Sequence, residues 1–306
     1  MKKFLRWFIL GITLFFLVRT FQDNWLQISN IHIGQRGWLM LILANFITLL
    51  AHIWAGYVWT LILTAFGENV PTFEFICVYL KTNVAKYLPG NIWHYYGRVM
   101  AAKNANVATE VATVSVLLEP LMMLASAVIL IIIFSGNLVI SSWNYGVIFL
   151  QCLLLFVVLF TIHPRCLNWL IKFLNSWKNR KKQKNQIYSL ENNSDIINSY
   201  PLIPLLGELV FLGLRGTGFI MTISALSSLS WEQIPLLFGA FTCAWVLGLV
   251  IPGAPSGLGV FETTAILLLQ SKWEMALIIS AIALYRLISI LAEIIGAAIA
   301  TLIIDN

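Results

Sequence analysis

Long runs of apolar residues, separated by short polar segments, dominate this sequence. A helix needs about 20 consecutive apolar residues to cross the hydrocarbon core of a bilayer. Six runs approach or exceed that length, and we predict that each forms a transmembrane helix. They are Phe4–Phe21, Trp38–Phe66, Thr109–Phe134, Trp143–Ile162, Leu202–Leu229 and Met275–Ile304.

The overall composition excludes a soluble enzyme. Apolar residues make up 59% of the 306 residues and charged residues only 10%, whereas soluble domains carry about 25% charged residues. The longest polar stretch, Pro164–Pro201, is too short to bury a core of its own. The sequence therefore predicts an all-α polytopic membrane protein with about six transmembrane helices.

Two further apolar stretches, Phe73–Lys103 and Trp231–Gln270, are each interrupted by a proline–glycine pair. Proline removes a backbone donor, and glycine weakens a helix. Non-helical backbone at membrane depth is tolerated only where it is buried in protein or lines a cavity. We therefore predict two re-entrant helical hairpins, each entering the membrane and returning on the same side. The residues expected at the hairpin breaks are Pro89, Gly90, Pro252, Gly253, Gly257 and Gly259.

The distribution of charge predicts the orientation in the membrane. The segment Pro164–Tyr200 has seven basic and two acidic residues, a net charge of +5 out of the chain's +6. Basic loops stay on the cytoplasmic side. Six spans and two hairpins that do not cross then place both termini in the cytoplasm.

The sequence also predicts an internal repeat. His52 precedes Pro89 by 37 residues, and Arg215 precedes Pro252 by the same number. We expect a first half, 1–140, with two spans, the hairpin 73–103 and one span. The second half, 141–306, has two spans with the basic loop 164–200 between them, the hairpin 231–270 and one span. Three crossings per half invert the second half relative to the first, a plan that many transporters use.

Seven charged residues lie in or beside the predicted membrane segments. A charge at the centre of a membrane helix costs about 2.5–3.5 kcal/mol, so these groups must be paired or face water. One interpretation is a set of interhelical ion pairs that only stabilise the bundle. The other, favoured for the set as a whole because three arginines are more than helix pairing needs, is a polar cavity near the midplane. Glu208/Arg215 and Arg286/Glu293 are each seven residues apart on one helix face and can point into a common interior. The seven are Arg98, Glu119, Glu208, Arg215, Glu262, Arg286 and Glu293.

Four of these charges form two candidate pairs with exchanged signs. Arg98 is followed by Glu119 in the first half, and Glu262 is followed by Arg286 in the second. Together with Arg215, these residues are the predicted binding site for a lipid headgroup. The arginines would hold a phosphate, because a guanidinium matches phosphate oxygens with two parallel hydrogen bonds. The glutamates would balance the arginines or meet a cationic headgroup.

Two motifs resemble those of a known membrane family. The run Tyr87–Arg98 (YLPGNIWHYYGR), with Glu119 in the next span, resembles the first signature of the transmembrane domain of lysylphosphatidylglycerol synthases and its stand-alone, flippase-like relatives. The run Pro252–Glu262 (PGAPSGLGVFE) resembles the second. The resemblance spans essentially the whole chain and implies lipid translocation, which in the bifunctional members moves aminoacylated phosphatidylglycerol between leaflets. Members often have smaller residues in place of Trp93 and His94.

These observations favour a flippase or transporter that moves a phospholipid or glycolipid headgroup through a charged midplane cavity. The sequence ends at Asn306 without an aminoacyl-transfer domain, so we expect a stand-alone member that is not an enzyme. An intramembrane lipid-modifying enzyme, with Glu119, Glu262 or His94 as a general base, and a scaffold for a separate lipid synthase are the alternatives. We expect no catalytic motif, metal or cofactor.

The expected partners are membrane lipids, namely an anionic phospholipid or a lipid-linked sugar. A lipid-synthesis enzyme is a further possible partner, nucleic acid is not expected, and the sequence does not indicate an oligomeric state. The expected location is the bacterial inner membrane.

Overall fold

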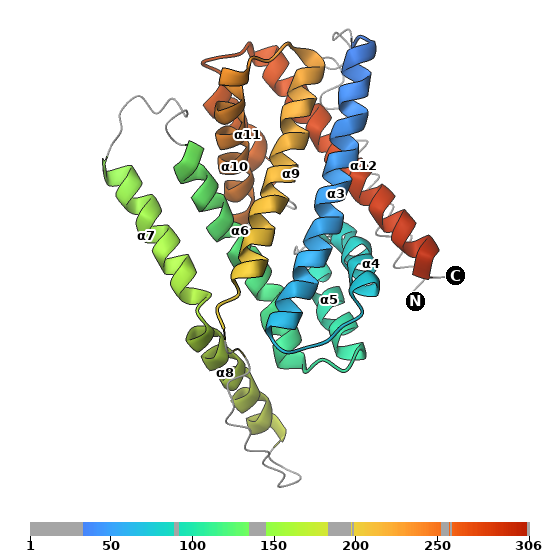
Figure 1. Cartoon of the computed structure of the whole chain (residues 1–306), viewed down its shortest axis with the longest axis vertical. Helices are drawn as coiled ribbons and strands as arrows, with labels where there is room; N and C mark the ends of the chain where they lie inside the picture. Colours follow the sequence, from blue (N-terminus) through green and yellow to red (C-terminus); the bar gives the residue numbers. More distant parts are fainter. Residues whose placement is uncertain are drawn as a thin grey trace.

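The computed structural model describes residues 33–88, 92–134, 145–182, 197, 199–251, 257 and 259–304. The predicted first span, Phe4–Phe21, and the terminal Asn306 lie outside the described residues, as do four of the predicted break residues, Pro89, Gly90, Pro252 and Gly253. Helices form nearly all of the described part, which contains no strand (Figure 1). They are α3 (Gln35–Ala65), α4 (Thr72–Asn83), η1 (Val84–Tyr87), α5 (Trp93–Asn104), α6 (Thr109–Phe134), α7 (Tyr145–Thr161), α8 (Pro164–Lys182), α9 (Leu202–Leu226), η3 (Trp231–Gln233), α10 (Ile234–Val250), α11 (Val260–Leu269) and α12 (Met275–Ile304).

Five helical segments are long and apolar enough to cross a membrane: α3, α6, α9, η3 with α10, and α12. The number rises to six if α7 and α8, which meet at a bend of 53°, count as one span. The predicted bounds of α6 and α12 agree with the structure, and those of α3, α7 and α9 agree to within a few residues. The prediction of an all-α polytopic membrane protein is thus confirmed.

Large apolar side chains are exposed on the surface of α7. Phe149, Phe156 and Phe160 are 69%, 66% and 61% exposed. A soluble protein rarely leaves such a contiguous apolar surface uncovered, whereas the hydrocarbon of a bilayer is a suitable solvent for it. The exposed apolar side chains of α7 are therefore suited to contact with lipid.

Helices α3 and α9 make the most extensive contact between any two described helices. A Cβ atom added at Gly207 would lie 2.7 Å from Val58 Cγ2, and one at Gly218 would lie 2.6 Å from Thr48 Oγ1. Small residues let membrane helices approach closely, which strengthens their van der Waals contact. Gly207 and Gly218 therefore let α9 pack tightly against α3, both before and after Arg215.

The two stretches predicted as hairpins each form helix, break and helix. In Figure 1, α4 and α5 lie beside the lower part of α3, while α10 and α11 lie in the upper half beside α9. The break before α11 contains Gly257 and Gly259, with φ of +69° and +86°, a region that residues with a side chain rarely adopt. Segment η3–α10 is by length able to cross a membrane, so re-entry of the two helix pairs stays a prediction.

Candidate functional site

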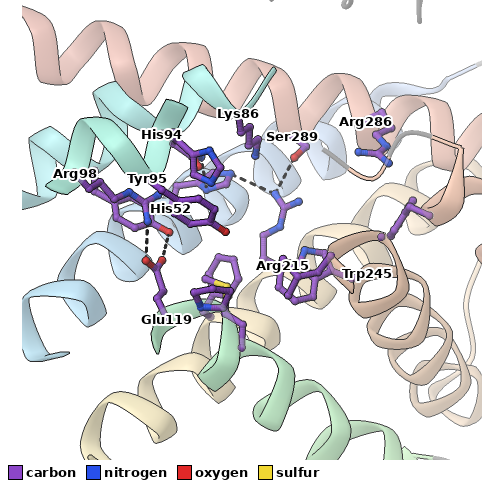
Figure 2. A pocket seen from close by; sticks show the side chains of 18 of the residues that line it. His52, Lys86, His94, Tyr95, Arg98, Glu119, Arg215, Trp245, Arg286 and Ser289 are labelled. Carbon is purple, nitrogen blue, oxygen red and sulfur yellow. Dashed lines mark hydrogen bonds and ion pairs between the residues drawn. The ribbon is translucent and has the colours of Figure 1, made fainter. Parts of the chain in front are cut away.

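A cavity of about 150 Å³ lies among the helices (Figure 2). Every long helix except α7 and α8 contributes to its lining, together with η1 and the shorter α4, α5 and α11. Four of the five predicted binding residues line it, and the fifth, Glu262, is paired with one of the four. The charged and histidine residues of the lining are His52, Lys86, His94, Arg98, Glu119, Arg215 and Arg286.

The first ion pair joins α5 to α6. Arg98 Nη1 donates to Glu119 Oε2 at 2.6 Å, and both side chains are 2% exposed. The Tyr79 hydroxyl on α4 donates to Glu119 Oε1, also at 2.6 Å. The Arg98 guanidinium lies 3.6 Å from the centroid of the Tyr79 ring, a cation–π contact that a desolvated site strengthens. The predicted pairing of Arg98 with Glu119 is confirmed, and Tyr79 is an addition that the sequence did not indicate.

The second ion pair joins α11 to α12. Arg286 Nε donates to Glu262 Oε1 at 2.5 Å, and Arg286 Nη2 donates to the carbonyl oxygen of Gly257 at 3.1 Å. Glu262 Oε2 accepts the backbone N–H of Gly259 at 2.7 Å. The predicted pairing is again confirmed. Because Glu262 already supplies a negative charge to the N-terminus of α11, this carboxylate occupies the place where an anion would bind a free helix end.

A third cluster was not predicted. Lys86 Nζ lies 2.6 Å from Glu293 Oε1, and His52 Nε2 lies 3.3 Å from the same oxygen. The sequence grouped Glu293 with Arg286 on one face of α12, yet Glu293 pairs with Lys86 from η1 instead. Lys86 and Glu293 are 207 residues apart, so no local spacing could have indicated their contact.

Arg215 differs from the other arginines of the lining. Its Nη1 donates to Ser289 Oγ at 2.9 Å and lies 3.3 Å from His52 Nε2. Tyr285 donates its hydroxyl to the Arg215 carbonyl oxygen at 3.2 Å, and its ring centroid lies 5.3 Å from the guanidinium. Among the described residues, no carboxylate lies within 4.0 Å of the Arg215 guanidinium.

Glu208 and Arg215, predicted to share one face of α9, do not contact each other. Glu208 is fully buried and does not line the cavity. Neither of its carboxylate oxygens accepts a hydrogen bond within the described part of the chain. Two helical turns separate the two residues, which is too far for direct contact.

His94, a possible general base for an enzyme, lines the cavity and is 6% exposed. Its ring centroid lies 3.8 Å from that of Tyr95. Its Nδ1 atom is buried and has no hydrogen-bond partner among the described residues. His94 is therefore positioned at the cavity without a described group that orients its imidazole through Nδ1.

Comparison with known proteins places the chain in a family. No match was found among curated proteins. The family model described as the lysylphosphatidylglycerol synthase TM region matches residues 4–296, which includes every residue that lines the cavity. The match thus covers almost the entire sequence and not only the two motifs. The chain belongs to the lysylphosphatidylglycerol synthase TM-region family.

Proposed function

We propose that this protein moves the polar headgroup of a phospholipid or glycolipid across the membrane through its charged cavity. Family membership and the apolar helices make it a membrane protein related to lipid metabolism or transport. The observation that carries the finer proposal is the meeting of three arginines from α5, α9 and α12 at one cavity among membrane helices. In such a cavity, fixed hydrogen-bond donors of the protein take the place of the water that hydrates the headgroup. The acyl chains stay in the bilayer.

The barrier that such a protein lowers is electrostatic. A charged headgroup must cross about 30 Å of hydrocarbon, where an unpaired charge is costly. Arg215 lies near the midpoint of α9, and Glu119 and Arg98 lie well within α6 and α5. In our proposal these side chains offer polar partners to the headgroup while it passes through the hydrocarbon region.

The arrangement of the two ion pairs supports an inverted repeat. Each pair joins the second helix of a broken pair to the long helix that follows it, α5 to α6 and α11 to α12. In Figure 1, α10 and α11 lie beside the upper part of α9, whereas α4 and α5 lie beside the lower part of α3. In our proposal each broken helix pair closes the cavity from one side of the membrane, as the repeats of alternating-access transporters do.

Leaflet exchange in reconstituted vesicles tests the proposal. Purified protein in liposomes should speed the exchange of acyl-chain-labelled lipids, and mass spectrometry should recover those lipids unchanged. Arg36→Gln, which removes a cation from the exposed start of α3, is the matched control for the cavity arginines. Exchange at the rate of empty liposomes together with a chemically altered lipid would favour the intramembrane enzyme.

A further inference from the structure

Three long helices bring polar side chains together near their midpoints. His52 lies near the middle of α3, Arg215 near the middle of α9 and Ser289 near the middle of α12. Nη1 of Arg215 is 2.9 Å from Ser289 Oγ and 3.3 Å from His52 Nε2. Figure 2 shows the Arg215 side chain directed toward these two residues, between the Arg98–Glu119 pair and Arg286.

Within the described part of the chain, Arg215 is the cation of the cavity lining whose charge no carboxylate compensates. Lys86 pairs with Glu293, Arg98 with Glu119 and Arg286 with Glu262. Four cationic side chains thus line the cavity and three carboxylates are paired with them, which leaves one positive charge when the histidines are neutral.

The uncompensated guanidinium is also deeply buried. Arg215 is 7% exposed, and its Nε has no hydrogen-bond partner among the described residues. A buried charge without a partner is costly, and a bound anion would remove that cost. Nε of Arg98 also lacks a partner among the described residues, but the charge of Arg98 is paired with Glu119 and that of Arg286 with Glu262. Arg215 therefore differs from both by its uncompensated charge.

We propose that Arg215, Ser289 and His52 form a subsite for the phosphodiester of a lipid headgroup that carries one net negative charge. This inference rests on the proposed function and names its substrate class. Arg215 offers the unused Nε–H donor, and Ser289 accepts a hydrogen bond from Arg215, so the Ser289 hydroxyl proton is free to donate to a phosphate oxygen. Because a guanidinium binds phosphate through a planar pair of donors, lysine is a poor substitute.

The charge balance separates three classes of headgroup. A singly charged phosphodiester neutralises the cavity. A zwitterionic headgroup brings a cation that needs a carboxylate, and the three carboxylates paired with the lining cations are already engaged. A neutral glycolipid leaves Arg215 unpaired. The expected order of exchange rates is therefore anionic first, zwitterionic second and neutral last.

The first experiment measures leaflet exchange of three acyl-chain-labelled lipids in phosphatidylcholine vesicles: phosphatidylglycerol, phosphatidylcholine and glucosyl diacylglycerol. We expect Arg215→Gln to slow phosphatidylglycerol exchange at least about tenfold, as loss of a charged hydrogen bond predicts. The rate for glucosyl diacylglycerol should not change, which shows that the variant is folded. Arg215→Lys and Ser289→Ala should give intermediate losses, and Arg36→Gln should match the wild type.

The second experiment distinguishes a lipid headgroup from free phosphate. The thermal midpoint of the detergent-purified protein is measured with glycerophosphoglycerol, inorganic phosphate or glycerol. Glycerophosphoglycerol should raise the midpoint of the wild type but not that of Arg215→Gln. A rise with inorganic phosphate and none with glycerophosphoglycerol would overturn the assignment to a lipid.

The outcomes separate this inference from the proposed function. If wild type and Arg215→Gln exchange all three lipids equally fast, the flippase stands and the subsite is wrong. If the wild type exchanges no lipid, the proposed function is wrong. The subsite is then overturned as well unless glycerophosphoglycerol stabilises the wild type through Arg215.

Discussion

Lys86 in η1 and Glu293 in α12 are 207 residues apart in sequence, yet their charged atoms lie 2.6 Å apart. Their side chains are 18% and 1% exposed. The contact ties η1, which lies between the two helices of the first broken pair, to the last long helix of the chain. His52 of α3 shares the same carboxylate oxygen at 3.3 Å, so three elements meet at Glu293.

Removing either partner of this pair should destabilise the protein more than removing both. Lys86→Met or Glu293→Gln leaves one buried charge uncompensated, which costs roughly 3–5 kcal/mol. The double variant lacks that charge and should recover much of the loss. Thermal unfolding in detergent measures the effect, with Glu74→Gln on the exposed side of α4 as control. If the stability losses of the two single variants simply add in the double variant, Lys86 and Glu293 are not coupled.

The contact between Glu262 and Arg286 should matter for leaflet exchange, so that the effects of replacing the two residues are coupled. We expect Glu262→Gln to slow leaflet exchange several-fold, and the Arg286→Gln background to relieve part of that loss, because an unpaired charge is worse than a removed pair. The amide oxygen introduced by Glu262→Gln can still accept the Gly259 N–H, so the turn before α11 is kept. The check is a double-mutant cycle on exchange rates, with Glu232→Gln on exposed η3 as control. A zero interaction energy would contradict the prediction.

Replacing Glu208 with methionine should stabilise the protein. Both carboxylate oxygens are buried without hydrogen-bond partners in the described structure, and leaving such a group unsatisfied costs about 1–3 kcal/mol. Methionine fills a similar volume without polar oxygen atoms. A higher thermal midpoint with unchanged leaflet exchange is the expected result. A lower midpoint would mean that the carboxyl group has a stabilising role.

Gly257→Ala should destabilise the turn before α11. Its φ of +69° costs a residue with a side chain roughly 1–2 kcal/mol, and the added Cβ would lie 2.8 Å from the Gly248 carbonyl oxygen. Gly213→Ala in α9 is the matched control, because a Cβ there meets no atom within 4 Å. Thermal midpoints of the two variants should differ clearly; equal midpoints would exclude a need for glycine at this turn.

The orientation in the membrane can be checked by thiol labelling. Single cysteines at Asn137 and Asn185, in a background without Cys77, Cys152, Cys166 and Cys243, should differ in reactivity toward an impermeant reagent on intact cells. We expect labelling at Asn137 only, because the basic segment containing Asn185 should stay in the cytoplasm. Labelling at Asn185 only would mean that the orientation in the membrane is opposite to the predicted one.

The long helices were predictable because each depends on a local pattern. The bounds of α6 and α12 follow from where apolar runs begin and end, and those runs agree with the structure. The break before α11 follows from proline and glycine, whose backbone preferences are local. The exchanged signs of the two arginine–glutamate pairs were also visible, since each pair lies within one half of the chain.

Contacts between distant helices were not predictable. The pairing of Lys86 with Glu293 joins the two halves of the chain, and no spacing within either half indicates it. The sequence predicted that all three arginines hold phosphate, with the largest effect at Arg98, and gave no sign that Arg215 stands apart. They differ only through their neighbours, because Arg215 meets a hydroxyl and an imidazole where Arg98 and Arg286 meet carboxylates.

The close packing of α3 on α9 limits where a lipid can reach the cavity. With Gly207 against Val58 and Gly218 against Thr48, these two helices leave no gap between them for an acyl chain. A headgroup with its chains still in the bilayer must therefore approach laterally through another side of the bundle. We expect the α3–α9 interface to keep its geometry throughout transport, so that a disulfide engineered across it would leave lipid movement intact.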